Sequence, residues 1–256
     1  MRIGALPNGI LSLFGLKIAR KSDLNRPFPV EISDADKSIF RYVRSNRLST
    51  STDERLYATI MACRHVVERG IDGDFVECGV WRGGNSVLAA GVFKAMNAGR
   101  SAWLFDTFAG MTAPTEADVN FRGEIAESKF KVNQRAGHND WCYAPIEQVT
   151  ANFQKAGLLS DRIKFIKGDV ARTLAVSGNL PEKISVLRLD TDWYESTKTE
   201  LEVLYPRLNT GGILIIDDYG HWGGARKAVD EYFAANARPF FQYIDHTGRI
   251  AVKPQS

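Results

Sequence analysis

The sequence predicts an α/β fold with a mostly parallel, seven-stranded sheet, helices on both faces and an antiparallel C-terminal hairpin. Three observations predict it. From residue 75 onward, short runs that are apolar almost throughout alternate with helical segments, which is typical of parallel strands covered on both faces. The last two strand-like runs are separated only by a turn. A chain of 256 residues is long enough for one large core.

The expected strands are apolar runs bounded by turn residues. They are FVEC (75–78), AWLFD (102–106), RIKFI (162–166), ISVLRL (184–189), GILII (212–216), PFFQYI (239–244) and RIAVK (249–253). The last two are joined through residues 245–248, whose sequence DHTG suits a hairpin turn. The expected helices cover residues 52–70, 86–97, 147–157, 195–208 and 222–236. Thr52 or Asp53 can cap the first of these helices.

Two segments lie outside this alternation. Residues 1–50 are expected to form an N-terminal arm, irregular apart from one short helix, and residues 51–256 the main domain. Within the arm, residues 9–21 are apolar with basic flanks but fall short of the roughly 20 apolar residues that span a bilayer. A packed arm that favours a homo-oligomer is expected instead. Residues 107–146 are an insertion, far longer than a usual connection, whose aromatic side chains favour an ordered lid.

The composition excludes several classes of protein. Apolar residues make up 44% and charged residues 25% of the chain, and the formal net charge of +3 is too small to indicate nucleic-acid binding. No segment is suited to crossing a membrane. The cysteines, Cys63, Cys78 and Cys142, are widely spaced and form no zinc motif. They favour a reducing, cytoplasmic location.

The segment ECGVWRGGNS (77–86) follows the first strand and opens a helix, where glycines and free N–H groups favour ligand binding. Gly79 and Gly84 have P-loop spacing and Ser86 is present, but Asn85 stands where the lysine of a P-loop belongs. A dinucleotide fingerprint fails because Trp81 replaces its second glycine. Both phosphate-binding interpretations are therefore disfavoured.

S-adenosylmethionine fits this loop better, because its methionine end carries a carboxylate and an ammonium group and no phosphate. The loop residues expected to contact it are Gly79, Gly83, Gly84, Asn85 and Ser86. Glu77 suits the ammonium group, Asp106 after the second strand suits the ribose hydroxyls, and Gly168-Asp169 after the third suits the adenine amino group. One such acid alone would be an ordinary solvated loop carboxylate, but acids at three successive strand ends favour a cofactor site.

The next two strands each end in a pair of aspartates, Asp190 with Asp192 and Asp217 with Asp218. Neighbouring parallel strands would bring the four carboxylates together beside the cofactor, where they would repel one another. A hard divalent cation removes this repulsion, and oxygen-only ligands suit Mg²⁺. The alternative is helix capping, since a helix follows each pair, but capping needs only one aspartate per helix.

The two aspartates of the first pair need not share a role. Asp190 stands directly at the strand end, where it can meet a metal and the cofactor. Asp192 lies one step further into the expected cleft, where it can take the proton of an acceptor hydroxyl. A metal-bound hydroxyl is more acidic, so a carboxylate is an adequate base for it.

These segments together resemble the macrocin O-methyltransferase family. The similarity is carried by DFVECGVWRGGNS, LFDTFAGM, DRIKFIKGDV, LRLDTDWYEST and LIIDDYGHWGGARKAVDEYF, in that order, between about residues 50 and 253. The resemblance implies a Rossmann-like class I methyltransferase fold and a metal- and S-adenosylmethionine-dependent enzyme that methylates sugar hydroxyls. It also implies that Asp190, Asp217 and Asp218 hold Mg²⁺ and that Asp192 is the general base.

Three functions stay open at this point. The first is methylation of a sugar on a natural-product glycoside, or of one destined for a polysaccharide; the second is methylation of a phenol or catechol. The third is a non-catalytic scaffold that binds a nucleotide or a partner. His221 is a second catalytic candidate, although a surface histidine at a helix start would look the same. The weaker candidates are Arg82 for an anionic substrate group, His138 and Trp141 in the lid, and Trp193 and Tyr194 for stacking.

Overall fold

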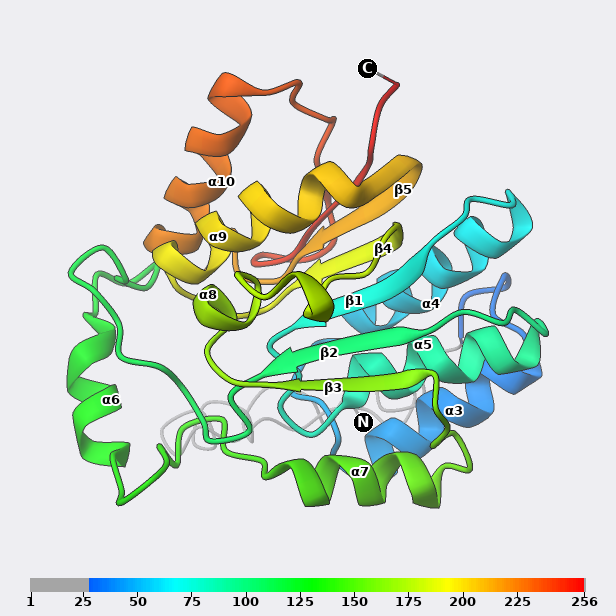
Figure 1. Ribbon diagram of the computed structural model, residues 1–256, viewed down its shortest axis with the longest axis horizontal. Helices are drawn as coiled ribbons and strands as arrows, with labels where there is room; N and C mark the ends of the chain where they lie inside the picture. Colours follow the sequence, from blue (N-terminus) through cyan, green and yellow to red (C-terminus); the bar gives the residue numbers. More distant parts are fainter. Residues whose placement is uncertain (1–27, 256) are drawn as a thin grey trace, which may run out of the picture.

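The computed structural model describes residues 28–255 and confirms the expected fold (Figure 1). Seven strands form one sheet in the order β3-β2-β1-β4-β5-β7-β6. They are β1 (Asp74–Cys78), β2 (Ala102–Asp106), β3 (Ile163–Lys167), β4 (Ile184–Leu189), β5 (Leu208–Ile216), β6 (Gln242–Tyr243) and β7 (Arg249–Val252). The first five strands are parallel, and β7 is antiparallel to both β5 and β6.

The predicted helices are present, and two short ones are additional to the prediction. The helices are α3 (Asp34–Ser45), α4 (Asp53–Glu68), α5 (Gly84–Ala95), α6 (Ala126–Asn133), α7 (Ile146–Lys155), α8 (Val170–Thr173), α9 (Tyr194–Leu204) and α10 (Gly223–Ala235), of which α6 and α8 are the additional ones. The hydroxyl of Thr52 accepts from the Arg55 backbone N–H, which makes Thr52 the N-cap of α4 as predicted. The helix predicted over 195–208 ends at Leu204, because Pro206 cannot continue the hydrogen-bond ladder and a 3₁₀ turn follows.

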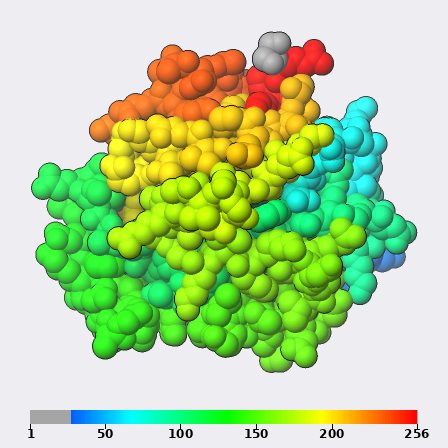
Figure 2. Space-filling model, viewed as in Figure 1, coloured from blue at the N-terminus to red at the C-terminus, as the bar shows by residue number. Residues whose placement is uncertain are grey.

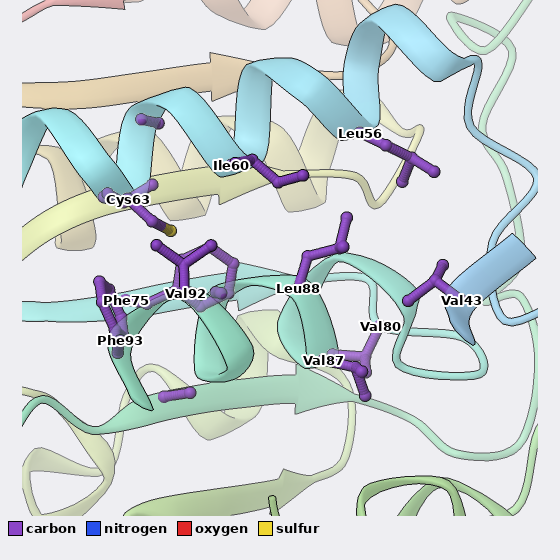
Figure 3. Packing of buried hydrophobic residues seen from close by; sticks show 14 of the residues in the cluster. Val43, Leu56, Ile60, Cys63, Phe75, Val80, Val87, Leu88, Val92 and Phe93 are labelled. Atoms are coloured by element: carbon purple, nitrogen blue, oxygen red, sulfur yellow. The ribbon is translucent and has the colours of Figure 1, made fainter. Parts of the chain in front are cut away.

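The core consists of two layers, one on each face of the sheet. On one face, Leu56 and Ile60 of α4 point toward Leu88 and Val92 of α5, above Phe75 of β1 (Figure 3). On the other face, the buried residues of α8, α9 and α10 pack on alternate residues of the same strands. Burial on both faces explains why the parallel strands are apolar at almost every position.

Part of the predicted N-terminal arm belongs to this core. Phe40 and Val43 of α3 are buried in the α4–α5 layer, and the Leu48 carbonyl accepts from the Gly84 N–H at 3.1 Å. The short helix expected within this arm is α3. The apolar segment 9–21 lies outside the described residues, so the arm and the oligomer expected from it stay predictions.

The insertion 107–146 is ordered and lies beyond the carboxyl ends of the strands (Figure 1). The buried Asp118 accepts from the Tyr194 N–H at the start of α9 at 2.9 Å, and the Val119 carbonyl accepts from the Gly223 N–H at the start of α10 at 2.8 Å. In the space-filling view the insertion (green) lies against α9 (yellow) (Figure 2). The insertion therefore docks on two helix starts.

Two strands differ from the sequence prediction by more than one residue at one end. The strand expected at 239–244 is reduced to Gln242–Tyr243, at the outer edge of the sheet. Pro239 has no N–H to donate, and Phe240 is 81% exposed. A short edge strand also limits edge-to-edge association. By contrast, β5 begins at Leu208, four residues before the predicted start, through a shift in its register with β4.

Candidate active site

A cleft of about 420 Å³ opens at the carboxyl ends of the parallel strands. The predicted site residues that line it are Glu77, Gly79, Gly84, Asn85, Asp106, Gly168, Asp169, Asp190, Asp192, Asp217, Asp218 and His221. Gly83 and Ser86 are not among its lining residues. Parallel neighbours place their carboxyl ends on one edge of the sheet, which is why residues so far apart in sequence converge here.

Three carboxylates come together at the base of this cleft. Asp190, Asp192 and Asp218 each contribute one oxygen to a group in which all three oxygens lie within 4.8 Å of one another. Burial and the neighbouring carboxylates raise the pKa of Asp190 and Asp218 well above the ordinary value, and burial is the main cause that raises the pKa of Asp192 to about 7. The Asp218 Oδ2 atom is buried without a hydrogen-bond partner. Such a group is short of positive charge.

Asp217, the fourth predicted carboxylate, has other partners. Its two oxygens form ion pairs with Arg188 and Arg55. Arg188 is fully buried and also donates to Glu77 at 2.8 Å and to Asp190 at 2.5 Å. Burial lowers the pKa of Arg188, but the three carboxylates outweigh burial and raise it. The role of Asp217 as a metal ligand stays a prediction, because both of its oxygens already face a guanidinium group.

The loop after β1 approaches the carboxylates closely. Gly79 has φ of 83°, and a Cβ added there would lie 2.0 Å from the Asp190 carbonyl oxygen. Glycine is therefore required by both conformation and space. Glu77, at the end of β1, accepts from Ser86 and Arg188, and burial raises the pKa of its carboxyl to about 7.

Asp106 holds this loop in place. Its carboxylate accepts from the backbone N–H groups of Val80 at 2.7 Å, Trp81 at 2.9 Å and Phe108 at 2.7 Å. The side chain thus links the loop after β1 to the end of β2 while still lining the cleft. After β3, Asp169 accepts from the Ala171 N–H at 2.9 Å and caps α8. Cofactor contacts of Asp106 and Asp169 stay predictions.

The opposite wall of the cleft is aromatic and comes partly from the insertion. Trp141 and Trp222 line the cleft, and their ring centroids lie 6.0 Å apart. Lys129 of α6 also lines it, with its Nζ 4.0 Å from the Trp141 ring centroid. His221 packs edge-on against Trp222, and burial lowers the pKa of its imidazole. Flat apolar faces beside polar groups suit a ring that carries hydroxyls.

Several weaker candidates lie elsewhere. Trp193 is buried and donates to the Thr112 carbonyl, whereas Tyr194 points outward and donates to Glu231. Neither lines the cleft. His138 stacks on Tyr143 within the insertion, and it too is absent from the cleft lining. Arg82 lies over the Trp81 ring, also outside the lining.

Sequence reasoning missed the cations that balance the acids. Arg188 carries a signal that could have revealed it, because a charged residue within an apolar strand must find partners when both faces of the sheet are covered. Arg55 carries no such signal. It lies on α4, distant in sequence from Asp217, and only the fold brings the two together.

The comparisons with known proteins agree with this geometry. A family model described as macrocin O-methyltransferase matches residues 46–250. The chain belongs to the macrocin O-methyltransferase family. The similarity is to the part of the chain that contains the sheet, the insertion and the carboxylate group.

Three characterised O-methyltransferases are similar to this chain over a shorter stretch than the family model. A tetracenomycin-C rhamnosyl 4'-O-methyltransferase of Streptomyces olivaceus is 39% identical over 65% of this chain. Demethyldecarbamoylnovobiocin O-methyltransferase of Streptomyces niveus and mycinamicin III 3''-O-methyltransferase of Micromonospora griseorubida are each 35% identical over 66% of it. The matches span 60, 61 and 65% of these relatives' lengths, respectively.

Solved structures place the fold in the same class. The O-methyltransferase NovP superposes with a TM-score of 0.70 at 30% identity, covering 79% of this chain and 80% of NovP. The calicheamicin methyltransferase CalS11 superposes with a TM-score of 0.59 at 16% identity, covering 93% of this chain and 98% of CalS11, and shows the fold alone. Within residues 28–255, none of the helices is both long and apolar enough to cross a bilayer.

Proposed function

We propose that this chain transfers the methyl group of S-adenosylmethionine to a sugar hydroxyl of a natural-product glycoside. The observation that carries the proposal is the group of Asp190, Asp192 and Asp218, facing the same cleft as the glycine loop after β1. Membership of the family supports the reaction. The names of the relatives, which concern tetracenomycin, novobiocin and mycinamicin, support a glycosylated antibiotic as the acceptor.

On the donor side, the loop and strand ends bind and orient the cofactor. Gly79 lets the backbone approach the ligand, and Asp106 keeps the loop against β2. Glu77 and Asp169, which both line the cleft, supply carboxylates for the ammonium and adenine amino groups, respectively. Fixing the sulfonium methyl group in line with the acceptor oxygen is the main task of such an enzyme, because the reaction is a direct displacement.

On the acceptor side, Asp192 takes the proton. The acceptor oxygen forms a bond to the methyl carbon, the carbon–sulfur bond breaks, S-adenosylhomocysteine leaves, and the hydroxyl proton passes to the Asp192 carboxylate. A raised pKa, about 7, makes this carboxylate a stronger base than an exposed aspartate. His221, which lines the same cleft, is the second candidate for this role.

Mg²⁺ belongs to the same proposal, and the residues fit it. The donor set is made of carboxylate oxygens alone. The Asp218 side chain also has a buried oxygen, Oδ2, without a hydrogen-bond partner. Asp190 and Asp218 would hold the ion, with Asp192 beside them and Asp217 as a further predicted ligand. A bound divalent cation would balance the carboxylate charges and lower the pKa of a hydroxyl that it coordinates.

The first test is calorimetric titration with S-adenosylhomocysteine, with and without Mg²⁺, on the wild type, Asp106→Ala and the exposed control Asp161→Ala. We expect the wild type and the control to bind and Asp106→Ala to lose at least about tenfold in affinity, since several hydrogen bonds are removed. Absence of binding to the wild type under every condition would overturn the proposal in favour of a scaffold.

The second test identifies the acceptor class. Methyl transfer is measured with a panel of deoxysugar glycosides and with catechol, before and after removal of divalent cations by EDTA. We expect turnover with a glycoside, its loss with EDTA and its return with Mg²⁺. Turnover with catechol but with none of the glycosides would contradict the sugar acceptor and identify the protein as a phenol methyltransferase.

A further inference from the structure

Glu200 is a fully buried carboxyl group that the proposed methyl transfer does not use. It lies on α9, its side chain has no exposed surface, and it is not part of the cleft lining. One oxygen, Oε1, lies 2.8 Å from the Thr191 hydroxyl, the carboxyl group also contacts the Cys78 thiol, a weak donor, and Oε2 has no nitrogen or oxygen partner. Within residues 28–255, no lysine, arginine or histidine forms an ion pair with it. A carboxylate in such surroundings is costly unless it is neutral.

The hydrogen bonds around Thr191 are consistent with a protonated Glu200. Thr191 Oγ1 has a single proton but lies 2.8 Å from both Glu200 Oε1 and Ser196 Oγ, and Ser196 Oγ lies 3.1 Å from the Trp193 carbonyl oxygen. A protonated Glu200 donates to Thr191, Thr191 to Ser196, and Ser196 to Trp193, so that every contact has one proton. An ionised Glu200 leaves one of the three contacts without a proton. Burial acts in the same direction and raises the pKa of Glu200 to about 8.

Thr191 connects this buried acid to the reacting carboxylates. It stands between Asp190 and Asp192, and it lines the cleft through its own atoms. Asp192 has φ of 72°, a conformation that residues with a side chain rarely adopt and that neighbouring contacts must maintain. The Cys78 thiol, at the end of β1, interacts with the same Glu200 carboxyl group. Glu200 thus contacts both the strand that precedes the glycine loop and the turn that carries the aspartates.

We propose that Glu200 is a positioning residue, which acts as an uncharged acid and holds the Asp190–Asp192 turn in its reactive conformation by donating to Thr191. The inference rests on the proposed function, because the turn matters for catalysis only if Asp190 and Asp192 take part in methyl transfer. Glu200 itself touches neither the cofactor nor the acceptor.

The kinetic test compares Glu200→Leu, Glu200→Gln, Thr191→Val and Thr191→Ser with the wild type. An amide can donate to Thr191 as the acid does, so Glu200→Gln should restore most of the kcat that Glu200→Leu loses, and Thr191→Ser most of the kcat that Thr191→Val loses. We expect Glu200→Leu and Thr191→Val to lower kcat by about 10- to 100-fold, the cost of a small displacement of reacting groups, with KM for S-adenosylmethionine within about twofold. The matched control is Glu202→Gln, an exposed position on the same helix, which should leave kcat unchanged.

The outcomes separate the two proposals. A wild type without turnover contradicts the proposed function, whereas an active wild type with unchanged kcat in Thr191→Val contradicts the inference alone. A Glu200→Gln variant as impaired as Glu200→Leu also overturns it, because the ionised form would then be required. If Glu200→Leu fails to fold, the kcat of Thr191→Val still tests whether the hydrogen bond between Glu200 and Thr191 is needed for turnover.

The protonation state has a readout that does not depend on activity. A difference infrared spectrum of wild type minus Glu200→Gln, recorded at pH 6 with ¹³C-labelled glutamate, should contain the C=O stretch of a protonated carboxyl group. A carboxylate signal at this position in its place would contradict the proposal.

Discussion

At the scale of single residues, the site depends on how one buried cation is shared. Arg188 faces Glu77, Asp190 and Asp217 from near the carboxyl end of β4, and Arg55 reaches Asp217 from α4. Asp190 has both kinds of neighbour, because it pairs with Arg188 and also meets Asp192 and Asp218, which form no ion pair with either arginine, in the cleft. The ion pairs thus hold Glu77 and Asp217 in structural roles, whereas the carboxylates of the cleft group are available to a ligand.

Replacing Arg188 by methionine should strongly destabilise the fold. The change removes the buried cation and leaves three carboxyl groups without it, so we expect the free energy of unfolding to fall by about 3–5 kcal/mol. Urea unfolding followed by circular dichroism measures this, with the exposed Arg162→Met as the control, expected within about 0.5 kcal/mol of the wild type. Unchanged stability in Arg188→Met would mean that the three acids are neutral in the native state.

The Asp192→Asn variant tests the base directly. Asparagine keeps the shape of the side chain but cannot accept the proton, so kcat should fall by about 10²- to 10⁴-fold while affinity for S-adenosylhomocysteine stays within about twofold. Initial rates and calorimetry supply the two values, and His221→Gln is measured in parallel. If Asp192→Asn keeps its kcat and His221→Gln loses it, the histidine is the base.

At the scale of elements, the turn between β6 and β7 is tied to the start of α4. Asp245 accepts from the Thr247 and Gly248 N–H groups at 3.0 and 2.7 Å, and from the Thr52 hydroxyl at 2.7 Å. It also pairs with Arg55 at 2.9 Å. Burial opposes the charge, but these contacts outweigh it and lower the pKa of Asp245 to about 2. A turn that looked local in the sequence therefore also anchors a helix from the other end of the domain.

This anchor predicts how stability depends on pH. Because the folded-state pKa lies below the unfolded value of about 3.9, the wild type should be more stable than Asp245→Asn above pH 4, by about 1–3 kcal/mol. The difference should shrink as the pH falls towards 2, where the folded protein also binds the proton. Urea unfolding of both proteins between pH 7 and pH 2 measures this difference, and Asp161→Asn, at an exposed position, should show no such trend. A difference that stays constant across this range would contradict the assignment.

At the scale of the whole molecule, the cleft is assembled from two parts with different origins. Part of its lining comes from the strand ends of the sheet, whereas Trp141 and Lys129, which belong to the proposed acceptor side, come from the insertion. The insertion is held by Asp118, which accepts from Tyr194 and from the Thr115 N–H and hydroxyl. Acceptor binding should therefore be separable from cofactor binding.

An Asp118→Ala substitution should loosen the insertion and leave the sheet intact. Loss of a buried carboxylate with three donors leaves those donors unpaired, a cost of about 1–3 kcal/mol each at most. We expect faster amide hydrogen exchange within residues 107–146, a raised KM for the acceptor, and unchanged affinity for S-adenosylhomocysteine. Glu127→Ala, at an exposed salt bridge in the same insertion, is the control. Equal exchange in both variants would show that Asp118 does not anchor the segment.

The sequence by itself determined the succession of the seven strands and most helices along the chain, and the positions of the acids at the strand ends. Both follow from local patterns. A parallel strand that is buried on both faces is apolar throughout, and polar residues follow it where its carboxyl end meets the cleft. Only the tertiary structure decided which carboxylates meet. Asp217 was predicted beside Asp218 as a ligand, yet its oxygens face Arg188 and Arg55, while the left-handed backbone at Asp192 places that carboxylate with Asp190 and Asp218. Such pairing depends on side chains from different elements and on one backbone angle, and neither leaves a periodic signal in the chain.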